Sequence, residues 1–167
     1  MPPNKRLKLV LLVVPIAVAM LGACRGRQDG SAASPSIASR LMAADSSVRW
    51  IVDSVLVADF SCDSVADSAF IGRAAEKITV AIAITGTPQP YVAVFGVHGS
   101  AVQEAACSPN VRLTVESLDF NPSEELGALE GFVRSISCKG LNLGEADCDA
   151  LHMYWNHKTN APSWWRL

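Results

Sequence analysis

Residues 78–85 read Ile78-Thr79-Val80-Ala81-Ile82-Ala83-Ile84-Thr85, an uncharged run in which six of eight side chains are β-branched. Residues of this kind favour strands over helices. Turn-forming sequence flanks the run, with Ala74-Ala75-Glu76-Lys77 before it and Gly86-Thr87-Pro88-Gln89-Pro90 after it. The stretch therefore predicts a strand that is connected by short turns to its neighbours in sequence.

The same pattern continues over most of the chain. From Val48 onward, β-branched and aromatic residues come in short runs between Gly- and Pro-containing turns. Strands are expected at Arg49–Ala58, Ser68–Arg73, Ile78–Thr85, Tyr91–Val97, Val111–Asp119, Leu151–Asn156 and Trp164–Leu167. Short helices are expected only at Ser36–Ala44 and at Glu124–Leu129, where Ser123 is a suitable N-cap. The sequence predicts a mainly β domain over residues 48–167, with one or two antiparallel sheets and meander connections.

Four cysteines lie in this domain: Cys62, Cys107, Cys138 and Cys148. An even number in an exported chain predicts two disulfides, with three connectivities open. Cys138 and Cys148 flank Lys139–Gly144, which has the composition of a loop, so the preferred pairing is Cys138–Cys148 with Cys62–Cys107. No CxxC spacing occurs, which argues against zinc and against a thioredoxin-like redox centre.

The first residues of the chain have the pattern of an export signal. Lys5, Arg6 and Lys8 precede an uncharged run from Leu9 to Met20, and small residues follow it. The tetrad Leu21-Gly22-Ala23-Cys24 resembles the lipobox of bacterial lipoproteins. That resemblance implies that residues 1–23 are a signal peptide and that Cys24 is lipidated and attaches the chain to a bilayer. The alternative is an ordinary secretory signal with a chance cysteine.

Residues 24–47 are rich in Gly, Ser and Ala, as expected of a flexible tether between the lipid and the domain. By the same resemblance, Arg25 after the cysteine favours an outer-membrane lipoprotein that faces the periplasm or the cell surface. Removing the signal peptide leaves eleven basic and sixteen acidic residues, a net charge of −5. Nucleic-acid partners are not expected, because binding to nucleic acid needs a basic face.

The segment Asp59–Asp67 places side-chain oxygens at its first, third, fifth and ninth positions: Asp59, Ser61, Asp63 and Asp67. The backbone carbonyl of Val65 occupies the seventh position. Calcium prefers six to eight oxygen ligands, and a tightly curled loop can supply them from alternate residues. The sequence therefore predicts a structural calcium site.

This segment resembles the calcium loops of FG-GAP and VCBS repeats, in which Asp-x-Asn/Asp-x-Asp-Gly-x-x-Asp precedes a short apolar strand. Here Ala69-Phe70-Ile71-Gly72 matches that strand, and the likeness extends over about 35 residues, one blade-like unit. The sequence departs from the pattern at Ser64, which replaces the turn glycine, and at Cys62. The alternative is a metal-free Asx-turn loop whose side chains cap backbone amides.

The C-terminal segment is expected to form a hairpin with two different faces. Alternation places Leu151, Met153 and Trp155 with Trp165 and Leu167 in the core. It places the remaining side chains together on the other face: His152, Tyr154, Trp164 and Arg166. This second set would suit a glycan, peptide or envelope protein partner, or would be a second buried face.

The sequence contains no Gly-x-Ser-x-Gly elbow, HExxH helix or phosphate-binding glycine loop. Its three histidines and two acidic pairs form no recognised catalytic pattern. The favoured interpretation is a non-enzymatic, calcium-stabilised envelope module that binds a partner or has a structural role. The alternative is a small hydrolase that acts on envelope polymers through carboxylates, which would require two acids about 5–9.5 Å apart in a cleft.

Overall fold

The computed structural model describes residues 36–97, 106–120, 122, 127–145 and 148–166. The chain divides into two units, Met1–Ala33 and Ser34–Leu167. The predicted signal peptide, Cys24 and residues 25–35 of the tether lie outside the described residues. So do residues 123–126, which contain the first half of the predicted second helix, and residues 127–129 after them have no regular secondary structure.

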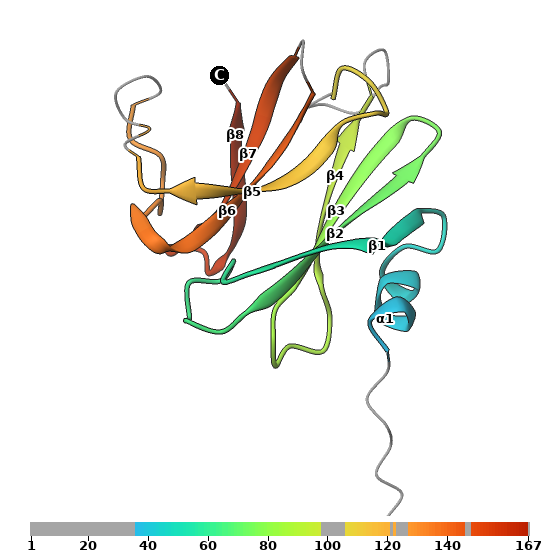
Figure 1. Ribbon diagram of the computed structural model, residues 1–167, viewed down its shortest axis with the longest axis horizontal. Coiled ribbons are helices and arrows are strands. Elements are labelled where there is room, and N and C mark those ends of the chain that lie inside the picture. The colour runs from blue at the N-terminus through green and yellow to red at the C-terminus, as the bar shows by residue number, and fades with distance from the viewer. Residues whose placement is uncertain (1–35, 98–105, 121, 123–126, 146–147, 167) are drawn as a thin grey trace, which may run out of the picture. The chain divides into compact units, whose positions relative to one another are not determined.

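The second unit contains two four-stranded antiparallel sheets and one short helix (Figure 1). The first sheet has the order β1-β2-β3-β4 and comprises β1 (Arg49–Ala58), β2 (Asp67–Ala74), β3 (Lys77–Ala83) and β4 (Tyr91–Gly96). The second has the order β5-β6-β7-β8 and comprises β5 (Arg112–Leu118), β6 (Ser135–Glu145), β7 (Cys148–Asn156) and β8 (Ala161–Arg166). Consecutive strands pair in both sheets, so the predicted mainly β, antiparallel meander architecture is confirmed.

The central strand β3 is buried on both faces. Its larger side chains, Ile78, Val80 and Ile82, point into the main core, which also contains residues of the second sheet. The small side chains of Ala81 and Ala83 lie on the opposite face. The alternation of large and small residues in the sequence therefore separates two packing layers.

Helix α1 (Ile37–Ala44) covers part of that opposite face, beside β1 in Figure 1. The hydroxyl of Ser36 accepts a hydrogen bond from the backbone N–H of Ser39 at 3.2 Å, which caps the helix. Leu41 is fully buried and packs with Phe70 and the alanines of β3. The predicted helix in this segment is confirmed. Among the described residues, no helix has the length and apolar composition needed to span a membrane.

All seven predicted strands are present, but β6 was missed, because Gly140 and Gly144 gave its sequence the composition of a loop. Gly140 has a structural reason to be in a strand. A Cβ at this position would lie 2.6 Å from the carbonyl oxygen of Met153 and 2.8 Å from Cδ2 of Leu118. The glycine thus permits a close approach of neighbouring elements and does not mark a turn.

Two disulfides are present, as predicted, but the predicted pairing is wrong. The structure joins Cys62 to Cys138 and Cys107 to Cys148. Cys138 lies in β6, whereas Cys148 pairs with Glu145 at the hairpin that follows. Because a strand rises about 3.3 Å per residue, the two cysteines lie too far apart for a disulfide, which needs Cα atoms within about 7 Å.

Candidate functional site

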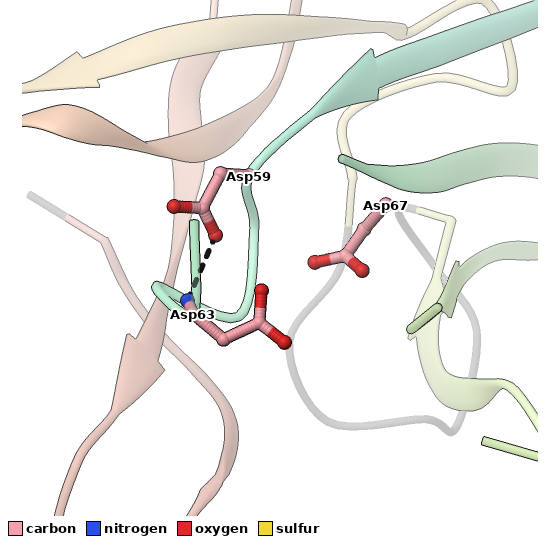
Figure 2. Close-up of side chains that lie close together, drawn as sticks. All are labelled: Asp59, Asp63 and Asp67. Atoms are coloured by element: carbon pink, nitrogen blue, oxygen red, sulfur yellow. Dashed lines mark hydrogen bonds between the residues drawn. The ribbon is translucent and has the colours of Figure 1, made fainter. Parts of the chain in front are cut away.

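The predicted calcium loop connects β1 to β2 and brings three aspartates together. One carboxylate oxygen from each of Asp59, Asp63 and Asp67 lies within 4.8 Å of the others. Figure 2 shows Asp63 and Asp67 pointing toward each other, with Asp59 beside Asp63. Asp67 is buried, Asp59 is partly buried and Asp63 is exposed. This cluster of three aspartates could hold a metal ion.

Backbone amides of the loop already donate to all three carboxylates. Asp59 accepts hydrogen bonds from the N–H groups of Asp63 at 3.1 Å and Ser64 at 3.0 Å. Asp63 accepts one from Val65 at 2.8 Å. These are the contacts expected of the metal-free Asx-turn alternative. They leave further acceptor capacity, since each carboxylate has about four lone-pair positions.

Asp67 holds the closing end of the loop. Its Oδ2 accepts hydrogen bonds from the N–H groups of Phe60 at 3.2 Å and Ser61 at 2.9 Å. Its Oδ1 accepts another from the N–H of Thr85, in the turn after β3, at 2.9 Å. Only 1% of Asp67 is exposed, so these three donors replace the water that its carboxylate loses. The sequence predicts only a strand residue at Thr85, because no linear pattern links it to Asp67, eighteen residues earlier.

Ser61 adds a separate observation. It is 8% exposed, and its hydroxyl oxygen is buried with no hydrogen-bond partner among the described residues. Buried hydroxyls are usually hydrogen-bonded. Ser61 is also the residue at the third position of the predicted calcium loop, so this unpartnered oxygen is one of the predicted calcium ligands.

The backbone of the loop has the left-handed conformation that the FG-GAP-like pattern assigns to glycine. Ser64, which stands at that glycine position, has φ of 69°, and Cys62 has φ of 61°. The disulfide from Cys62 to Cys138 attaches this part of the loop to β6. The N–H of Lys139 also donates to the carbonyl of Asp59 at 2.9 Å. The loop of the first sheet is therefore held by a strand of the second sheet.

The predicted C-terminal face is not formed as expected, because the hairpin has a different register. Met153 is opposite Trp164 and His152 is opposite Trp165. Trp164 therefore packs against the main core, where its ring lies 6.0 Å from that of Phe95. Trp165 replaces it beside His152 and Tyr154 on the other face. The predicted group of His152, Tyr154, Trp164 and Arg166 is thus divided between two faces.

The outer face of this hairpin is mostly buried. Trp165 and Tyr154 form a cluster with Leu118 and Cys138, and residues of the segment before β6 pack against it. The hydroxyl of Tyr154 donates to the carbonyl of Glu130 at 2.9 Å. This arrangement matches the alternative of a second buried face and does not form an open aromatic binding surface.

His152 has an acidic partner that the sequence did not indicate. Its Nδ1 lies 2.9 Å from Oε2 of Glu116 in β5, and its ring stacks on Trp165 with centroids 4.8 Å apart. Burial raises the pKa of the Glu116 carboxyl, while the hydrogen bond and charge of His152 oppose that rise. The pair connects β5 to β7 across β6. Because the sequence did not predict β6, it gave no reason to expect Glu116 and His152 close together.

Three cavities among the described residues have no aspartate or glutamate in their walls. Neither His152 nor Glu116 lines any of them.

Comparison with known proteins found no family model, no curated protein and no solved structure that matches this chain.

Proposed function

We propose that the chain is a membrane-anchored envelope lipoprotein whose β domain is a non-enzymatic module stabilised by calcium. The observation that carries the calcium assignment is the convergence of three carboxylates in a loop that also contains a buried, unpartnered Ser61 hydroxyl. These are the hard oxygen donors that calcium prefers. Asp59, Ser61, Asp63 and Asp67 would hold the ion through side chains, and Val65 would hold it through its carbonyl.

Calcium would act by reducing repulsion in a loop that is already shaped by hydrogen bonds. Two carboxylates at about 4 Å repel by about 1 kcal/mol in water and about 4 kcal/mol at an effective dielectric constant of 20. A bound divalent cation would convert that repulsion into attraction. The role is structural, because ligands from one short loop leave no position for a substrate.

The test is a thermal unfolding experiment on the purified oxidised chain with calcium or with a chelator. A ligand that binds only the folded state at a hundred times its Kd stabilises by about 2.7 kcal/mol. For a domain of this size, that corresponds to a Tm increase of roughly 10 °C. Equal Tm values in the two conditions would contradict the calcium assignment.

Asp63→Asn is the most informative variant, because the amide oxygen of Asn can still accept the hydrogen bond from Val65. It removes the charge and keeps the turn. We expect Asp63→Asn to lose most of the calcium-induced shift while its Tm in chelator stays close to the wild-type value. Asp53→Asn, an exposed aspartate in β1 outside the loop, is the matched control and should keep the whole shift.

The membrane anchor rests on the Leu21-Gly22-Ala23-Cys24 tetrad at the end of the apolar run. Cells that express the chain can be labelled with a fatty-acid probe. We expect the wild type to take up the label and the Cys24→Ser variant to take up none, because the thiol is the acceptor. Equal labelling of the two chains would refute the anchor and leave the calcium proposal standing.

A further inference from the structure

A groove with a volume of about 400 Å³ lies on the outer face of the first sheet, beside α1. Apolar side chains form most of its wall: Ile37, Val52, Val55, Val57, Phe70 and Ala83. A volume of this size falls in the range of roughly 300–1,000 Å³ that is typical of small-molecule sites. None of the three clustered aspartates lines the groove.

The three valines of β1 form an exposed apolar track. Val57 is 60% exposed, and Val52 and Val55 are each 42% exposed. Surface strands usually present polar side chains to water, and a contiguous apolar patch on a soluble domain marks a binding site more often than chance exposure does. The track therefore offers an apolar surface on which a ligand could lie.

Arg40 contributes a cation to the wall of the groove. Nη2 of Arg40 donates to the carbonyl of Thr87 at 2.9 Å, which fixes the guanidinium beside the groove. Its Nε is buried without a hydrogen-bond partner, and no described carboxylate forms an ion pair with it. Arginine stays charged in proteins, and a partly buried charge is normally paired. An anion from the occupant would complete this arrangement.

We propose that the groove binds a long-chain fatty acid, with its acyl chain along the valines of β1 and its carboxylate at Arg40. One cation in the wall of an apolar groove matches a ligand with one anionic end and an unbranched apolar tail. A peptide strand would bring many backbone polar groups, for which these side chains offer few partners. The hydroxyl of Thr85, which also lines the groove, already donates to the carbonyl of Ala66 at 2.6 Å. This inference goes beyond the proposed function and does not depend on lipidation of Cys24 or on calcium.

The test uses the chain with Cys24→Ser, which carries no lipid of its own at that position. Fluorescence titration with cis-parinarate, a polyunsaturated fatty acid whose emission rises in apolar surroundings, measures binding directly. Palmitate and hexadecanol, added as competitors, have the same tail length and differ in charge. We expect saturable binding of cis-parinarate and tighter competition by palmitate than by hexadecanol.

Val57→Asp places a charge in the track and should weaken binding at least tenfold. Val115→Asp, at a 40% exposed valine of the second sheet, is the matched control and should leave binding unchanged. Arg40→Gln should weaken palmitate roughly tenfold and leave hexadecanol unaffected, since hydrogen bonds to charged groups are the stronger ones. Arg40→Lys should restore part of the loss. Circular dichroism establishes that each variant is folded.

Three results would overturn the proposal: no binding of cis-parinarate to the folded wild type, equal losses in Val57→Asp and Val115→Asp, or equal losses of palmitate and hexadecanol in Arg40→Gln. Binding of an apolar peptide without binding of fatty acid would assign the groove to a protein partner and would also overturn it.

Discussion

The two disulfides provide a matched pair of perturbations. They join residues 76 and 41 positions apart in the sequence. The chain-entropy relation for these loop lengths gives about 4.5 kcal/mol for Cys62–Cys138 and about 3.9 kcal/mol for Cys107–Cys148 at 25 °C. Removing either bridge should therefore lower the free energy of unfolding by a similar amount, about 4 kcal/mol.

Only one of the two bridges contacts the aspartate loop. Cys62 lies between Asp59 and Asp63 and has a left-handed backbone conformation, which its bond to Cys138 helps to hold. We therefore expect the double variant Cys62→Ala/Cys138→Ala to lose most of its calcium-induced stabilisation as well. Cys107→Ala/Cys148→Ala should retain it.

Urea unfolding followed by tryptophan fluorescence, with calcium or chelator, measures both effects in one series. A loss of 4 kcal/mol is a large part of the stability of a typical domain, so trimethylamine N-oxide should be present at equal concentration for all chains. The reasoning about the loop is refuted if both double variants lose the same calcium-induced stabilisation, or if neither loses any. Unequal losses in chelator, by more than about 2 kcal/mol, would contradict the entropic estimate.

Three further predictions concern local features of the structure. Ser64→Gly should raise the free energy of unfolding by about 0.5–1 kcal/mol, because relief of the left-handed conformation exceeds the entropic cost of glycine. Its control, Ser68→Gly in β2, brings the entropic cost alone and should lower the free energy of unfolding. Gly140→Ala should lower the free energy of unfolding by about 1–3 kcal/mol through overpacking against β7, measured by urea unfolding. The raised pKa of Glu116 means that the folded state binds the proton more tightly than the unfolded state does. The free energy of unfolding of the wild type, relative to that of Glu116→Gln, should therefore fall as the pH rises from the ordinary value of 4.5 through the raised pKa. Glu130→Gln is the control with the opposite sign, since the hydrogen bond from Lys158 lowers the pKa of Glu130.

The strands of the first sheet could be predicted from sequence because each carries its own local pattern. The alternation of large and small residues in β3 appears without knowledge of its neighbours, and turns of ordinary composition delimit it. The glycines of β6, in contrast, cannot be explained from the residues next to them in sequence. Gly140 is present because Leu118 and Met153 approach it, and both are distant in sequence. A local pattern cannot report a contact that is made only after folding.

The aromatic face of the C-terminal hairpin was mispredicted for a geometric reason. In an antiparallel pair, a shift of one residue in register exchanges the faces of a whole strand. Asn156 pairs with Ala161 across a four-residue turn, which places Trp164 inside and Trp165 outside. The sequence showed that a hairpin exists but did not determine the length of its turn. The disulfide pairing failed for a related reason, because it depends on how β6 separates Cys138 from Cys148.

The aspartate loop is the exception, since its candidate ligands lie within nine residues and the sequence alone could bring them together. The structure adds to the loop its long-range connections. Asp67 receives a hydrogen bond from Thr85 in the turn after β3, and Cys62 is bonded to Cys138 in β6. A change in the loop would therefore act on both sheets at once. If calcium binds there, its removal should lower the protection of backbone amides against hydrogen exchange in both β3 and β6. If the loop is only an Asx turn, that protection should not depend on calcium.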